Sequence, residues 1–119
     1  MTMKYIQIGS LIVGLLLSLI GIYRIVVWYG YWRANYKGKL LTEGPYKTVR
    51  HPYYAAFLIL ITGIVLLVQI FETIALVILS YPVVIFYVSK EEEELIKKYG
   101  KRYRDYMEKV PWRLIPHVW

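Results

Sequence analysis

Residues 53–89 read YYAAFLILITGIVLLVQIFETIALVILSYPVVIFYVS, and Glu72 is the one charged residue among them. A single helix over this stretch would be about 55 Å long, nearly twice the ~30 Å hydrocarbon core of a bilayer. Two helices joined by a tight turn at Gln69–Thr73 fit better, because Glu72 then lies where it can reach water. Strands of this length are rare, and an open sheet cannot satisfy its edges in lipid. The stretch therefore predicts two membrane spans, 53–70 and 73–89.

An earlier apolar stretch predicts a further span. Tyr5–Tyr23 carries no charged residue and has about the ~20 residues that a spanning helix needs. We expect this helix to cover 5–28. A signal peptide is the competing interpretation, but the stretch exceeds a ~7–15 residue apolar region and no small-residue cleavage site follows it. Small residues form a stripe along one face: Ser10, Gly14, Ser18 and Gly21. Such a stripe lets another helix approach closely, either within the chain or in a homodimer through this first helix.

The composition excludes several classes of protein. Hydrophobic residues make up 58% of the 119 residues, against about 45–50% in soluble domains. A disordered chain would be poor in apolar residues, and a small soluble globule would have too little interior for this many. The chain has no cysteine and two histidines, so we expect no disulfide scaffold, no thiolate zinc site and no other metal.

The basic residues indicate the orientation in the membrane. The loop 30–50 and the tail from Lys90 onward are rich in lysine and arginine, whereas the turn near Glu72 has none. The positive-inside rule puts the loop and the tail in the cytoplasm. This topology accounts for the net charge of +7, and no nucleic-acid recognition module is visible, so we expect no nucleic-acid partner.

The tail from Glu91 predicts an amphipathic helix over 91–110. One face of that helix carries apolar and aromatic residues: Leu95, Ile96, Tyr99, Tyr103, Tyr106, Met107 and Val110. The rest of its surface is basic. A helix of this kind is suited to lying against anionic membrane lipid or to covering the end of the helix bundle. The sequence thus predicts a single all-α integral membrane domain over 1–119, with three transmembrane helices and a cytoplasmic amphipathic C-terminal helix.

Polar residues gather on the predicted cytoplasmic side. The hairpin of 53–70 and 73–89 brings Arg50 and His51 near the glutamates that begin at Glu91. Arg50 could simply extend to lipid phosphate, and the glutamate run could be a solvated face. However, four adjacent glutamates at the C-terminal end of a membrane helix repel one another and oppose the helix dipole. Function is one common reason for such a conflict.

Two sequence blocks, 40–54 and 91–111, resemble the isoprenylcysteine carboxyl methyltransferase family and its phospholipid methyltransferase relatives. The first block reads L-x-T-x-G-x-Y-x-x-x-R-H-P-x-Y. The second reads E-E-x-x-L-x-x-x-Y-G-x-x-Y-x-x-Y-x-x-x-V-P. The blocks occur in the family's order and separation, and they cover most of residues 38–116.

This resemblance implies an integral membrane enzyme that uses S-adenosylmethionine. The predicted topology puts its active site on the cytoplasmic side. Carried over by position, the cofactor-binding residues are Lys39, Leu40, Leu41, Tyr46, His51, Pro52, Tyr53, Tyr54 and Glu91. Lys39 occupies the start of the family's loop without matching its usual side chain. The physical chemistry is compatible, because tyrosine rings attract a sulfonium by about 0.5–2 kcal/mol and a carboxylate accepts strong hydrogen bonds from ribose or amino groups.

The same resemblance implies candidate catalytic residues: Arg50, Glu92 and Tyr87. Tyr87 stands where the carboxyl methyltransferases have an arginine that contacts the substrate, so the acceptor stays open. A lipophilic, prenylcysteine-type carboxylate is the first choice, and a lipid amine headgroup is the alternative. A non-catalytic membrane scaffold subunit is the alternative of another class.

Overall fold

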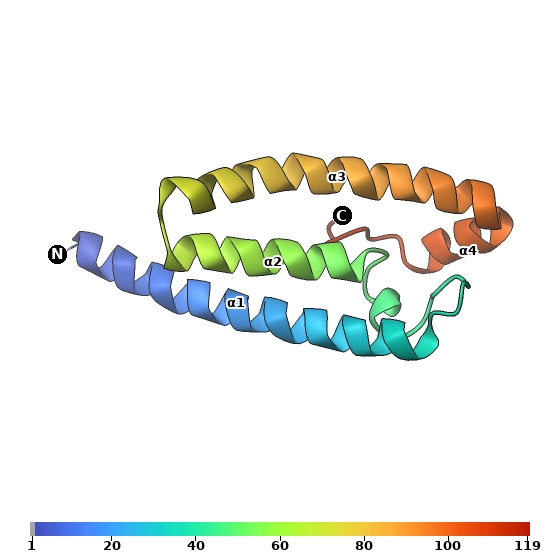
Figure 1. Ribbon diagram of the computed structural model, residues 1–119, viewed down its shortest axis with the longest axis horizontal. Coiled ribbons are helices and arrows are strands. Elements are labelled where there is room, and N and C mark those ends of the chain that lie inside the picture. Colours follow the sequence, from blue (N-terminus) through green and yellow to red (C-terminus); the bar gives the residue numbers. More distant parts are fainter. Residues whose placement is uncertain (1) are drawn as a thin grey trace.

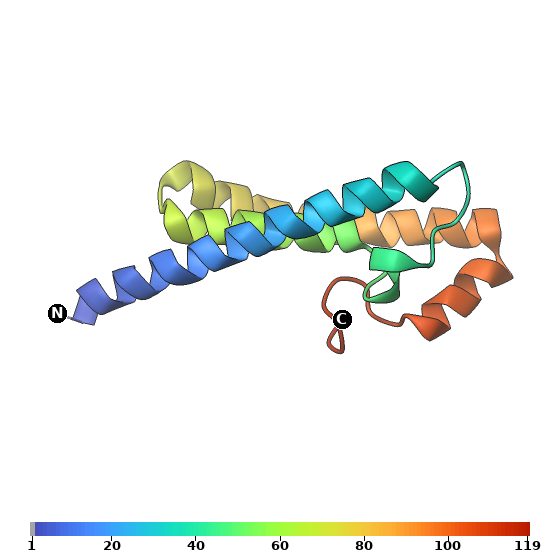
Figure 2. The ribbon, with the colours of Figure 1, turned by 90° about the horizontal axis from the view of Figure 1, so that it is seen from below.

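The computed structural model describes residues 2–119, and every regular element in that part of the chain is helical. The elements are α1 (Thr2–Asn35), the 3-10 helix η1 (Gly44–Lys47), α2 (Pro52–Leu67), α3 (Phe71–Tyr99) and α4 (Lys101–Lys109). Figure 1 shows α1, α2 and α3 side by side with α2 in the middle, each running opposite to its neighbour. Figure 2 shows α4 and the C-terminal segment on one side of the three long helices. The all-α prediction is confirmed.

The small-residue stripe of α1 packs against α2. A Cβ added at Gly14 would lie 2.9 Å from the carbonyl oxygen of Gly63, and one added at Gly21 would lie 2.7 Å from the backbone nitrogen of Leu60. Glycine therefore sets how closely the two helix backbones approach. Of the two partners that the sequence left open for this stripe, the structure has α2 of the same chain. The homodimer through α1 stays an expectation, and the exposed outer face of α1 is the surface left for it.

The expected number of membrane-length helices needs correction. Two helices, α1 and α3, are long and apolar enough to cross a membrane. The 16 residues of α2 correspond to about 24 Å, short of the ~30 Å hydrocarbon core. Pro52 fixes the first turn of α2, and the chain leaves the helix after Leu67 to turn through residues 68–70. The structure thus has two membrane-length helices rather than three.

The expected helix over 91–110 is also corrected, because the chain divides it. The glutamates continue α3 as far as Tyr99, and Gly100 then adopts a φ of 57°. Glycine takes this left-handed conformation without a steric penalty, so the helix ends there. The chain turns back into α4, which buries Tyr103 and Tyr106 against Tyr46 of the loop.

The buried residues form two clusters that position the ends of the helices. One lies between α2 and α3 and includes Leu58, Val84 and Val88. Leu114 of the C-terminal segment joins it, which draws that segment back onto α2. The other cluster is formed by α4 and Val110 packed on the loop and on the end of α3. Together they hold the loop 36–51, the last turns of α3 and the C-terminal segment at one end of the bundle.

Candidate functional site

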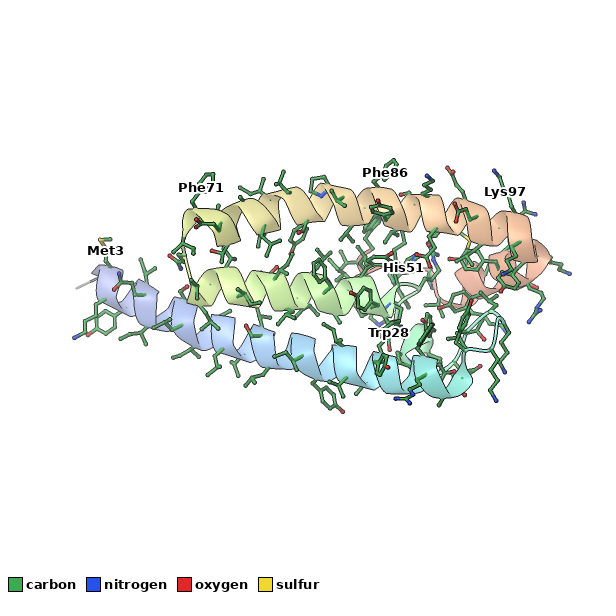
Figure 3. All side chains as sticks on the ribbon, in the orientation of Figure 1. Met3, Trp28, His51, Phe71, Phe86 and Lys97 are labelled. Atoms are coloured by element: carbon green, nitrogen blue, oxygen red, sulfur yellow. The ribbon has the colours of Figure 1, made fainter. Side chains whose placement is uncertain are left out.

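Two adjoining pockets lie at the end of the bundle where α1 ends and α2 begins. The larger, called here the wide pocket, has a volume of about 280 Å³. The smaller, called here the narrow pocket, has a volume of about 180 Å³. The two share wall residues: Trp32, Tyr46, Arg50 and Glu91. Figure 3 shows Trp28 and His51 toward this end, which also carries Lys97, whereas Met3 and Phe71 lie at the opposite end.

All the residues predicted to bind the cofactor line these pockets. Lys39, Leu40 and Leu41 line the wide pocket. The narrow pocket has His51, Pro52, Tyr53 and Tyr54 in its wall, and Tyr46 and Glu91 belong to both. Contact with a cofactor stays a prediction, but the structure does assemble around one space residues that come from separate segments of the chain.

The three predicted catalytic residues differ in position. Arg50 lines both pockets. Glu92 is 3% exposed and lines neither of them. Tyr87 is 54% exposed, packs edge-on against Phe86 and also lies outside both walls. Of the three, Arg50 alone is placed to meet a ligand in these pockets.

Aromatic residues in the last turns of α1 and directly after it form a wall that the sequence did not predict. Trp28, Trp32 and Tyr36 follow one another at intervals of one turn, with ring centroids 5.9 and 5.3 Å apart. Trp28 also contacts the ring of Tyr53 at 4.8 Å, and its indole nitrogen donates a 2.9 Å hydrogen bond to the Tyr46 hydroxyl. The four-residue spacing was a usable signal. It is equally typical of an interfacial aromatic belt, so it does not by itself indicate a pocket.

Tyrosines of α4 complete the wide pocket. Tyr106 donates a 2.6 Å hydrogen bond to the backbone carbonyl of Tyr46, and Tyr103 and Tyr106 both line the wall. Burial raises the pKa of the hydroxyls of Tyr46, Tyr103 and Tyr106 above the ordinary value for tyrosine. These hydroxyls therefore stay protonated at neutral pH and act as neutral hydrogen-bonding groups.

Glu92 is the centre of a buried ion cluster behind the pockets. Its Oε2 accepts hydrogen bonds from Arg50 Nε at 2.7 Å and from His51 Nε2 at 2.8 Å. Its Oε1 accepts a bond from Arg113 Nε, also at 2.8 Å. Two guanidinium groups at hydrogen-bond distance hold the carboxylate in its charged form. The hairpin predicted that Arg50 and His51 would meet the glutamates. Arg113 was missed, because no local pattern marks it.

Glu91 faces away from this cluster. Adjacent residues of a helix point about 100° apart, so Glu91 lines the pockets while Glu92 is buried behind them. Within residues 2–119, no hydrogen bond or ion pair engages the Glu91 side chain. A half-buried carboxylate with this freedom can accept hydrogen bonds from a ligand.

The C-terminal segment fixes the start of α2 from outside. The backbone nitrogen of Arg50 donates to the carbonyl of Trp112 at 2.9 Å, and that of His51 donates to the carbonyl of Arg113 at 3.0 Å. These bonds pair two short stretches that are far apart in sequence. The bonds fix the positions of Arg50 and His51, because the backbone there cannot shift without breaking the bonds.

Comparison with known proteins identifies sequences that are similar to this chain. The family model described as phospholipid methyltransferase matches residues 4–102. Protein-S-isoprenylcysteine O-methyltransferase B of Arabidopsis thaliana is 35% identical over 74 residues, which are 61% of this chain and 38% of the relative. Delta(14)-sterol reductase of Mus musculus is 28% identical over 83 residues, which are 68% of this chain and 20% of the relative.

The chain thus spans less than two fifths of the length of either curated relative. No solved structure matches it significantly. The family match covers most of the chain, including α1, α2 and α3 with the pocket residues that they carry. It confirms the resemblance that the two sequence blocks indicated. The chain therefore belongs to the phospholipid methyltransferase family.

Proposed function

We propose that this protein is a membrane methyltransferase that takes its methyl group from S-adenosylmethionine and transfers it to a lipophilic acceptor. One observation carries the proposal: the residues matched to the family's cofactor site, which come from 39–54 and from Glu91, all line two adjoining pockets. Family membership and two membrane-length helices support it.

The pocket walls fit the chemistry of this donor. When bound, the donor supplies a methyl group activated by a positively charged sulfur. Aromatic faces attract such a cation, and the narrow pocket presents the rings of Trp28, Tyr53 and Tyr54. Glu91 offers an acceptor for ribose or amino groups, and Lys39 at the wide pocket offers a cation for the donor's carboxylate. The chain's own part is to orient the reactants and exclude water, which can lower a barrier by several kcal/mol.

The first acceptor to consider is a prenylcysteine-type carboxylate. The name of the Arabidopsis relative supports it, and a carboxylate is already deprotonated at neutral pH. The clamp for such an acceptor is not evident, since the Arg50 guanidinium bonds Glu92 and the carbonyls of Val110 and Pro111.

The second acceptor is the amine of a lipid headgroup. Its supporting observation is the combination of aromatic rings with the Glu91 carboxylate in the narrow pocket, which suits an ammonium cation. The description of the family model points the same way. We propose that the pocket end of the bundle faces the cytoplasm, where a soluble donor is available and the bilayer supplies the acceptor.

Calorimetric titration with S-adenosylhomocysteine tests the proposal against a non-catalytic scaffold. We expect the detergent-solubilised chain to bind it, and Glu91→Gln to weaken the affinity by about 10- to 100-fold through loss of a charged hydrogen-bond acceptor. Glu93→Gln is the matched control, because Glu93 is exposed and lines neither pocket. The absence of binding by the unmodified chain would support the scaffold instead.

A further inference from the structure

We propose that His51, paired with Glu92, is a general base that deprotonates an ammonium acceptor in the narrow pocket. This inference rests on the proposed function with its second acceptor, the amine of a lipid headgroup, and adds one thing to it: a catalytic proton acceptor. It stands on the geometry of three groups, namely the buried carboxylate of Glu92, the ring of His51 and the aromatic wall of the narrow pocket.

The hydrogen bond between Glu92 and His51 fixes which ring nitrogen carries the proton. Glu92 Oε2 lies 2.8 Å from His51 Nε2. An ionised carboxylate can only accept hydrogen bonds, and the guanidinium groups of Arg50 and Arg113 keep Glu92 ionised. Nε2 must therefore be the donor in this pair. In the neutral ring the lone pair then lies on Nδ1, the nitrogen that points away from the carboxylate. The ring nitrogen away from the carboxylate is also the base in the Ser-His-Asp triad, although there it is Nε2.

Nδ1 is free to meet a ligand. Within residues 2–119 no protein group makes a hydrogen bond to it. In the same part of the chain no fully buried side-chain nitrogen lacks a partner, so Nδ1 keeps some exposed surface although His51 as a whole is 4% exposed. His51 lines the narrow pocket, and in this proposal Nδ1 is on the side of the ring that meets a ligand there.

The surroundings of His51 suit a cation beside a base. The titratable and charged groups around His51 come from three elements. They are Glu91 and Glu92 of α3, Tyr53 and Tyr54 of α2, and Arg50, which precedes His51 in the chain. Arg113 and Tyr103 do not bond His51 but bond the same carboxylate, Glu92. Glu91 and the rings stabilise positive charge in the pocket. Glu92 stabilises positive charge on His51 after it takes a proton.

An amine acceptor needs a general base, whereas a carboxylate acceptor does not. An ammonium nitrogen has no lone pair, so it must first lose a proton. That proton passes to Nδ1, and the freed lone pair forms the new N–C bond as the S–C bond of the donor breaks and S-adenosylhomocysteine is left. The imidazolium then releases the proton to water. A carboxylate is already a nucleophile at neutral pH, so with such an acceptor the pair would have no proton to remove.

His51→Gln is the variant that separates the base from the fold. The amide nitrogen of glutamine can keep the hydrogen bond to Glu92, but an amide cannot take a proton from an ammonium. The other histidine of the chain gives the matched control, His117→Gln, because His117 is exposed and lies outside both pockets. The affinity of each variant for S-adenosylhomocysteine is measured first. Rates are then compared at a donor concentration that saturates every variant, so that weaker donor binding does not lower the rate.

Labelled methyl transfer is then followed with vesicles that contain an ethanolamine phospholipid, and separately with a prenylcysteine analogue. We expect His51→Gln to lower the rate on the amine by about 10²- to 10⁴-fold near neutral pH, the usual contribution of a general base. The loss should shrink as the pH approaches about 10, where a free amine deprotonates in solution. His117→Gln should leave the rate unchanged.

Nitrogen NMR of the two histidines gives a readout that does not depend on activity, with the His117→Gln spectrum providing the assignment. We expect the neutral ring of His51 to carry its proton on Nε2 and its lone pair on Nδ1, as the hydrogen bond to Glu92 requires. A neutral ring protonated on Nδ1 would overturn the inference. So would a rate loss that is equal at all pH values, or methylation of the carboxylate alone by a chain that binds S-adenosylhomocysteine. Those results leave the proposed function standing, whereas absence of S-adenosylhomocysteine binding removes the proposed function itself.

Discussion

The buried carboxylate of Glu92 is the point at which removal of one charge should cost most stability. Its side chain is 4% exposed and that of Arg50 is 5% exposed. Three donors converge on it, from Arg50, His51 and Arg113, at 2.7 to 2.8 Å. Glu92→Gln keeps the volume of the side chain but removes the negative charge. The Arg50 guanidinium would then stay buried beside a neutral amide.

The expected magnitude follows from this burial. Breaking a buried ion pair by removing one partner typically costs about 3–5 kcal/mol, because the other charge is left uncompensated. The Arg113 side chain is 32% exposed, so water can solvate its guanidinium when the carboxylate is lost. The loss of stability should therefore come mainly from the buried Arg50 guanidinium. We expect Glu92→Gln to lower the free energy of unfolding by about 3–5 kcal/mol, which is roughly a 10²- to 10⁴-fold change in the unfolding equilibrium.

Denaturant titration in mixed micelles measures this change, with helicity as the signal. Glu93→Gln is the control, since Glu93 is exposed on the same helix and surface substitutions usually change stability by less than about 0.5 kcal/mol. Arg113→Ala should be milder than Glu92→Gln. If Glu92→Gln and Glu93→Gln proved equally stable, the carboxylate would not be holding buried positive charge and the account of the cluster would be refuted.

Three further predictions concern packing, topology and the acceptor. Gly63→Ala should destabilise the chain by about 1–3 kcal/mol in the same titration, because its Cβ would lie 2.5 Å from the α1 backbone. Gly9→Ala, inside α1 with nothing within 4 Å, should instead stabilise it by up to about 1 kcal/mol. A reporter fusion at Trp119 should lie in the cytoplasm and one at Glu72 on the opposite side of the membrane. A common side would mean that α3 does not span the membrane. Tyr87→Arg should raise the rate on a carboxylate acceptor and lower it on an amine. An unchanged rate with both would mean that Tyr87 lies outside the path of the acceptor.

Local patterns in the sequence were sufficient to predict which segments are helical and that His51 lies near the glutamates of α3. The apolar run of 53–89 with one charge at its middle predicts two antiparallel helices, and the structure has them as α2 and α3. That hairpin alone brings His51 close to the glutamates of α3, because the start of one helix must lie beside the end of the other. The helix ends were less readable. Gly100 could continue or stop the helix, and the burial of the α4 tyrosines decides that it stops.

Other features depend on contacts between residues distant in the chain. Trp28 and Trp32 follow an interval that fits a membrane interface as well as a pocket wall, and the packing of α1 against α2 decides between them. Arg113 has no motif around it, yet its side chain bonds Glu92 and its carbonyl accepts from the backbone of His51. Sequence determines which segments are helical, since apolar periods, prolines and glycines act locally. Tertiary structure decides which side chains share the buried carboxylate, since that depends on how the C-terminal segment folds back across the end of the bundle.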